Sequence, residues 1–192
     1  MNDQTAAVKK NSLILIIKRH MLLVISIIIS LLVALIITVA IKHKQNSNNI
    51  ETSEQFNKAR ILIVNQKFIE GKKILNEIIK KNNKFYSPLS LYLIIENDLE
   101  KNPKIITQLF DEILLIKKIE KENLDLIRIK KAIFLANFDS ENEIEKTLEP
   151  IIESNSICRE KAISLLADYF LSKQKKKKAD QYYNLLKSKN NK

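Results

Sequence analysis

Hydrophobic and polar positions follow two different patterns along this chain, and the first is an unbroken apolar run. Residues 21–41 are twenty-one in number and include no charge, no proline and no glycine. About 20 apolar residues in a helix span the roughly 30 Å hydrocarbon core of a bilayer. The run therefore predicts a single transmembrane helix over 21–41, with Lys18 and Arg19 on one flank and Lys42 and Lys44 on the other.

A cleaved signal peptide and a buried core helix are two other interpretations of the run. A cleaved signal peptide has an apolar region of about 7–15 residues and a small-residue cleavage site; Thr38, Val39 and Ala40 loosely resemble such a site, but the run is too long. A core helix of a globular domain shows a polar stripe, and none is present here. We expect a permanent anchor, with cleavage as the alternative.

The residues around the run predict three short segments. Residues 1–20 form a basic tail, in which the apolar stretch 13–17 is too short to span and is expected to lie at the membrane interface. Residues 42–52 are polar and rich in Asn and Ser, which favours a linker. Residues 53–189 are then expected to form one domain, of ordinary size for a single core.

The second pattern is a helical periodicity of apolar positions that starts after the linker. Phe56, Ala59, Leu62 and Ile63 share the first helical face, and the pattern restarts after each polar turn. Cap signals mark some starts, such as Ser87 before Pro88, Asn102 before Pro103, and Asp139 or Ser140. Eight helices are predicted, beginning near 53, 68, 87, 103, 120, 140, 156 and 176.

These helices form four pairs whose first members begin near 53, 87, 121 and 156, at intervals of 34, 34 and 35 residues. A helix–turn–helix unit recurring at about 34 residues is typical of tetratricopeptide repeats, which stack into an α-solenoid. The fold class predicted is all-α, one transmembrane helix followed by about four such pairs. The chain carries one glycine and three prolines, too few turn residues for an all-β domain.

Single residues also resemble the tetratricopeptide family. Phe68, Gly71 and Leu75 match its aromatic, small and large positions in the second helix of the first pair. Ala179 and Tyr183 match its small and aromatic positions in the last pair. The middle pairs depart from the pattern, because they lack a glycine at the small position and the closing proline is missing or displaced.

In architecture the chain further resembles the ancillary SecYEG translocon subunit family of bacterial inner-membrane proteins. The resemblance covers a short basic tail, one span and a repeat domain beyond it. It implies a role in the export or folding of envelope proteins, through contact with translocon subunits or periplasmic chaperones. That family has no catalytic motif that could be compared here.

Charge gives the predicted direction of the span. Four basic residues precede it (Lys9, Lys10, Lys18 and Arg19), and two follow closely. Lys and Arg concentrate on the cytoplasmic side, which predicts a cytoplasmic N-terminus and a periplasmic domain at the bacterial inner membrane. The formal net charge of +11 does not indicate nucleic-acid binding, because Lys, Ile and Asn together reflect an AT-rich codon bias.

Residues that carry chemistry are scarce beyond the span. His20 and His43 both flank it, Cys158 is the only cysteine, and Gly71 is the only glycine. These counts exclude histidine-based catalysis, a cysteine or histidine zinc site and a glycine-rich phosphate loop in the domain. We expect no enzyme activity, no cofactor and no metal, and interpret the acidic clusters such as Glu141, Glu143 and Glu145 as helix surface.

Tyr169, Tyr182 and Tyr183 are the candidate partner-contact residues, because aromatic side chains in the last pair can bind an extended segment. Packing at the end of the solenoid explains them equally well. The run Lys175–Lys178 is open to an acidic partner or lipid, or is a solvated face. The predicted function is a membrane-anchored protein–protein interaction scaffold; the alternative is an envelope assembly factor that acts through self-association as a homo-oligomer.

Overall fold

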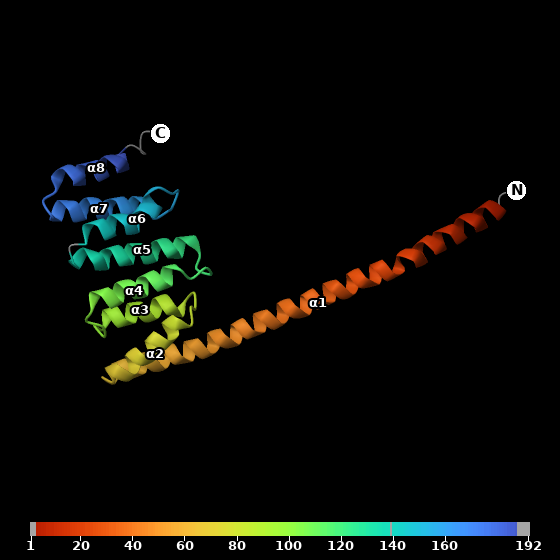
Figure 1. The fold of residues 1–192 in the computed structure, drawn as a ribbon, viewed down its shortest axis with the longest axis horizontal. Coiled ribbons are helices and arrows are strands. Elements are labelled where there is room, and N and C mark those ends of the chain that lie inside the picture. The colour runs from red at the N-terminus through yellow and green to blue at the C-terminus, as the bar shows by residue number, and fades with distance from the viewer. Residues whose placement is uncertain (1–2, 139, 188–192) are drawn as a thin grey trace. The chain divides into compact units, whose positions relative to one another are not determined.

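The computed structural model describes residues 3–138 and 140–187, with side chains from Met21 onward except those at 22, 24, 41 and 45–47 (Figure 1). All regular structure in these residues is helical, which confirms the all-α fold class. The elements are α1 (Asp3–Val64), α2 (Phe68–Lys80), α3 (Tyr86–Glu96), α4 (Pro103–Leu114), α5 (Lys121–Leu135), the 3-10 helix η1 (Ala136–Phe138), α6 (Glu141–Ile152), α7 (Arg159–Ser172) and α8 (Lys176–Lys187).

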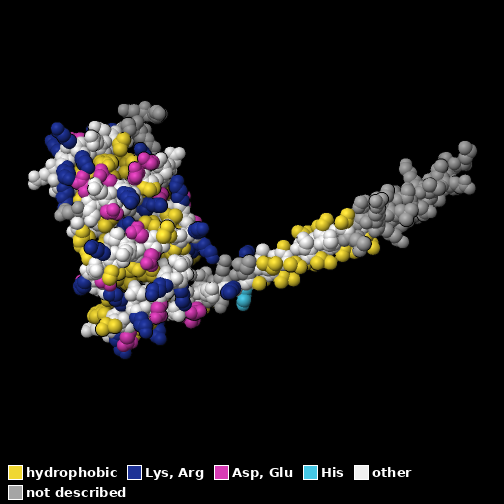
Figure 2. Space-filling model, viewed as in Figure 1, with side chains coloured by type: hydrophobic (Ala, Val, Ile, Leu, Met, Phe, Trp, Pro, Cys, Tyr) yellow, Lys and Arg dark blue, Asp and Glu magenta, His cyan; other side chains and the backbone are white. Residues whose placement is uncertain are grey.

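Residue contacts divide the chain into two units, Met1–Glu51 and Thr52–Lys192, and α1 passes through the division. Among the described helices, α1 is the one long and apolar enough to cross a membrane. The described large apolar side chains between Met21 and Val39 are each at least 43 % exposed, so these side chains do not pack into a core of the protein (Figure 2). The hydroxyls of Ser26 and Thr38 donate to the carbonyls of Leu23 and Leu35, which satisfies both without water.

The segment 42–52, expected to be a linker from its polar composition, has a regular backbone. It is helical throughout and belongs to α1. Helical propensity of Asn and Ser is modest rather than prohibitive, and the flanking helical turns on both sides propagate through the segment. The division between the two units nevertheless falls at its end, between Glu51 and Thr52.

The second unit is a succession of helices in which each element from α2 to α8 packs on the next in the chain (Figure 1). The last turns of α1 pack on α2, where Gly71 lies against Ala59 and Ile63. The apolar faces of α2 and α4 are buried through Leu75, Ile79, Ile106, Phe110 and Ile113, whereas Phe68 at the start of α2 is exposed. Local neighbours therefore supply most of the packing.

Three of the turns share one backbone geometry. Gln66, Asp98 and Gln174 adopt positive φ values of 62°, 53° and 58° after α1, α3 and α7. In each turn the next N–H donates to a carbonyl five residues earlier, as Lys67 N does to Leu62 O at 2.8 Å. This left-handed closure ends a helix and reverses the chain, and it occurs after the first helix of three of the four predicted pairs.

The cap signals were right at one helix and wrong at another. Asn102 caps α4, because its side chain accepts from Lys104 N at 3.0 Å with Pro103 in the first turn. Ser87 does not cap α3: the Asn83 side chain accepts from Tyr86 N instead, at 3.0 Å. Ser87 is buried, and its hydroxyl lies 3.1 Å from Ile78 O and 3.2 Å from Ile79 O at the end of α2, so it satisfies terminal carbonyls of the preceding helix.

The other predicted starts show smaller differences. Ser140 stands at the N-cap position of α6, but its hydroxyl donates to Phe138 O at 3.4 Å and makes no capping hydrogen bond; Asp139 lies outside the described residues. Ser156 precedes α7 by three residues, and its hydroxyl accepts from Cys158 N. Pro150 lies inside α6, which continues to Ile152; its missing N–H falls in the last turn of this short helix.

Two clusters of buried side chains form the core. The first joins α1, α2, α3 and α4 to the start of α5 and is centred on residues such as Leu75, Leu91 and Phe110. The second joins the rest of α5 to α6, α7 and α8 around Phe170. The boundary falls within α5, which gives Ile127 to the first cluster and Ile129 to the second.

Candidate functional site

The basic flanks of the predicted span are described only on one side. Lys42 and Lys44 are helical and exposed. The side chains of Lys18 and Arg19 lie outside the described residues. The direction of the span therefore rests on the charge pattern of the sequence.

The three candidate tyrosines all make contacts within their own domain. Tyr169 on α7 is 7 % exposed and meets the ring of Phe170 edge-on at 5.5 Å between centroids. The ring of Tyr182 on α8 stacks on the ring of Phe170, with 5.6 Å between the centroids and 7° between the planes. Tyr183 donates to Asp168 Oδ1 at 2.6 Å. The packing interpretation accounts for these contacts, and partner binding by the three residues stays a prediction.

Hydrogen bonds and charges tie α8 to α6 in the same region. Tyr182 Oη donates to Glu145 Oε1 at 2.9 Å, and burial raises the pKa of this phenol to about 12. Lys178 Nζ lies 2.5 Å from Glu141 Oε1 and 4.7 Å from the ring centroid of Phe170. Lys175 also pairs with Glu141. Two of the four lysines in the run 175–178 therefore neutralise carboxylates of their own domain.

The Glu141 pairs predict a pH dependence of stability. The hydrogen bonds donated by Lys175 and Lys178 hold the pKa of the Glu141 carboxyl below its ordinary 4.5. A carboxyl whose pKa is lower in the folded state contributes stability above its unfolded pKa, and this is lost as the pH falls through the folded pKa. The stability difference between the native chain and Glu141→Gln is expected to be full above pH ~4.5 and to shrink below it, measured as urea midpoints across a pH series.

Glu143 provides the matched control for this measurement. It lies on the exposed side of the same helical turn and forms no ion pair in the described part of the chain. Glu143→Gln removes the same charge without removing the two lysine contacts. An identical pH profile for the two variants would contradict the role assigned to the Glu141 pairs.

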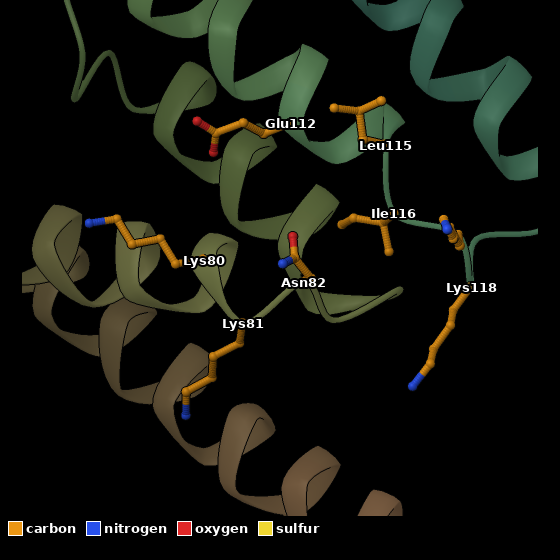
Figure 3. Close-up of a pocket in the computed structure, with 8 residues that line it drawn as sticks. Lys80, Lys81, Asn82, Glu112, Leu115, Ile116 and Lys118 are labelled. Atoms are coloured by element: carbon orange, nitrogen blue, oxygen red, sulfur yellow. The ribbon is translucent and has the colours of Figure 1, made fainter.

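A further surface, not anticipated from the sequence, lies where α2 and α4 end (Figure 3). We call it the lysine groove; it encloses about 700 Å³ and is lined by Lys80, Lys81, Asn82, Glu112, Leu115, Ile116, Lys117 and Lys118. In Figure 3 the Asn82 side chain stands between Lys80 and the loop that carries Ile116 and Lys118. Asn82 adopts a φ of 52°, which turns the chain sharply after α2.

A sequence signal for this groove exists in retrospect. Lys80–Lys81 and Lys117–Lys118 are two lysine pairs, the first at the end of α2 and the second in the loop just after α4. Positions that are equivalent in consecutive repeats come close together when the repeats stack. A search for lysine pairs that close the second helix of consecutive repeats would have indicated the groove, whereas the longest run of lysines, 175–178, indicates a different place.

Some of the other charged side chains form ion pairs within the domain. Glu100 accepts from Lys72 Nζ at 2.8 Å, and this hydrogen bond lowers the pKa of the carboxyl. Lys131 on α5 pairs with Asp111 on α4 at 2.6 Å. Within the described residues, no three His, Cys, Asp or Glu side chains gather as a metal site would require. Comparisons of the chain with protein-family models, with curated proteins and with solved structures found no match.

Proposed function

We propose that this chain is a membrane-anchored scaffold for protein–protein interaction that acts at the outer face of a bacterial inner membrane. The observation that carries the proposal is the joining of one apolar helix of spanning length to a domain of successive helices in a single chain. The helix fixes the location, and the domain offers a large surface to other proteins. In this arrangement the partners are themselves expected in or near the membrane.

The helix positions support a repeated hairpin of the tetratricopeptide kind. The second helices of the proposed pairs begin at Phe68, Pro103, Glu141 and Lys176, at intervals of 35, 38 and 35 residues. The left-handed turns after α1, α3 and α7 fall between the two helices of a pair. Repeat domains of this kind bind proteins through extended surfaces rather than closed pockets.

The assignment to protein export follows from the resemblance in architecture to the ancillary translocon subunits. It is supported by the basic residues before the span, which favour a cytoplasmic N-terminus. The proposed partners are translocon subunits and periplasmic chaperones. Fold does not fix function, so the partner is the quantity to measure.

Chemical crosslinking in cells, followed by purification of the tagged full chain from solubilised membranes, tests the proposal. A matched control keeps residues 1–51 and carries an unrelated soluble domain, which identifies proteins recovered through the membrane segment alone. Recovery of specific partners with the full chain is the expected result. A uniform homo-oligomer without other proteins would instead favour the self-association alternative.

Topology is tested separately. A reporter fused after Lys192 that works only outside the cytoplasm is expected to be active, and its cytoplasmic counterpart inactive. The opposite pattern would overturn the orientation and the export role together, while leaving the anchor itself intact.

A further inference from the structure

The lysine groove carries more positive charge than its own domain neutralises. Glu112 is the single acidic residue in its lining, against four lysines. Lys81 Nζ donates to Gln55 Oε1 at 2.9 Å. In the described part of the chain, Lys80, Lys117 and Lys118 make no ion pair or side-chain hydrogen bond. Three ammonium groups around one hollow are thus available to a ligand.

The helix dipole explains the position of only some of these lysines. Lys80 occupies the last turn of α2, where a cation offsets the negative end of the helix dipole. Lys117 and Lys118 lie beyond Leu115, the residue that caps α4. The dipole effect falls off within the last turn, so it gives no reason for a second lysine pair at this place.

An apolar surface lies among the charges. Leu115 is 80 % exposed and Ile116 beside it is 6 % exposed, so Leu115 offers most of the accessible apolar surface in the lining. A single exposed leucine on a surface is ordinary. Its position inside a hollow of about 700 Å³ with four cations is not, because ligand sites combine an apolar lining with a few placed charges at volumes of roughly 300–1,000 Å³.

We propose that the lysine groove binds an extended acidic segment of a partner protein, with one large apolar side chain of that segment against Leu115. The inference deepens the proposed scaffold function and rests on it, because it names the chemistry of the partner. The carboxylates of the segment pair with the lysines, and the apolar side chain covers the surface that Leu115 and Ile116 present.

The lining favours carboxylates on a protein over phosphates on a nucleic acid or lipid. It contains no arginine, the residue whose planar fork suits bidentate phosphate binding. It contains no aromatic ring on which a base could stack. Glu112 would repel a compact phosphate group, whereas an extended peptide can place a backbone N–H or its apolar side chain beside that carboxylate.

The test is a fluorescence anisotropy titration of a short labelled peptide of Asp and Glu with one central Leu. The full chain is held in nanodiscs of neutral lipid. Saturable binding that weakens with salt is expected. The double variant Lys117→Glu and Lys118→Glu is expected to weaken binding about tenfold or more, because two attractive exposed pairs become repulsive.

Two further variants separate the groove from general charge. Lys176 and Lys177 on α8 are exposed, so Lys176→Glu with Lys177→Glu makes the same change in net charge elsewhere and is expected to leave binding unchanged. Leu115→Ser is expected to weaken the Leu peptide severalfold and to leave a peptide with central Gly unaffected. Equal loss in both lysine variants, or no loss in the groove variant, would overturn the proposal. Far-UV circular dichroism verifies that each variant is folded.

Two further measurements test a lipid as the ligand and separate the groove assignment from the scaffold function. Groove-dependent binding to nanodiscs containing an anionic phospholipid, without peptide binding, would overturn the acidic segment and assign a lipid. If crosslinking recovers the same partners with the groove variant as with the native chain, the scaffold function holds and the groove assignment fails. Loss of a partner on reversing Lys117 and Lys118 alone would support both.

Discussion

Replacing Phe170 with alanine is expected to lower the free energy of unfolding of the helical domain by about 4 kcal/mol. Phe170 is fully buried at the centre of the second cluster. Its ring contacts Tyr169 and Tyr182, and the ammonium group of Lys178 lies 4.7 Å from its centroid. Truncation removes these contacts together and leaves a cavity in the second cluster.

Urea unfolding of the full chain in nanodiscs, followed by tyrosine fluorescence, measures this loss. Phe68→Ala is the matched control, because Phe68 is 47 % exposed at the start of α2; a change of at most about 1 kcal/mol is expected there. Similar losses for the two variants would show that the second cluster does not centre on Phe170.

Hydrogen exchange adds a spatial test of the same substitution. Phe170 belongs to the cluster built by α5, α6, α7 and α8, and the first cluster is formed by other residues. Each helix of this domain packs mainly on its neighbours in the chain, so local openings need not involve the whole domain. Phe170→Ala is expected to raise amide exchange in α6, α7 and α8 much more than in α2 and α3. Equal increases throughout would indicate a single cooperative core.

The helical content of this protein could be predicted from its sequence because the apolar periodicity is strong and the connections are short. The faces carrying Leu75 and Phe110 repeat at helical spacing, and both residues are buried. Asn102 before Pro103 could be identified as a helix start. The first N–H groups of a helix lack backbone partners, so an Asn side chain can accept from one of them and a proline without an N–H fits the first turn. These signals are local, so one sequence suffices to detect them.

Other features depend on which segments meet in space, and local signals do not contain that information. Ser87 satisfies a general cap pattern, yet its hydroxyl is taken by Ile78 O and Ile79 O of the preceding helix. The lysine groove joins residues 80–82 with 112–118 across two helices. The polar segment 42–52 is helical although its composition does not favour a helix, because it lies between two helical parts of α1. In each case tertiary or flanking context overrides the local preference.

Gly71, which matches the small position of the tetratricopeptide pattern, is the site of the second large expected effect. A β-carbon at position 71 would lie 2.8 Å from Ile63 Cγ1 and 3.3 Å from the carbonyl oxygen of Ala59. Ile63 is branched and 6 % exposed, so it has little room to move. Gly71→Leu is expected to lower the free energy of unfolding by about 3 kcal/mol, because overpacking forces α1 and α2 apart.

Gly71→Ala separates helix propensity from packing at the same site. In an exposed helix interior this change gains about 1 kcal/mol; here the gain is expected to vanish or reverse, since the added methyl group meets Ile63. In the background Ile63→Ala, which removes the obstructing Cγ1, Gly71→Leu is expected to cost at least about 1.5 kcal/mol less than in the native chain. Urea midpoints of the four chains in the cycle measure this coupling. Additive losses would mean that α2 does not approach α1 through Gly71, and that the first hairpin is held by other contacts.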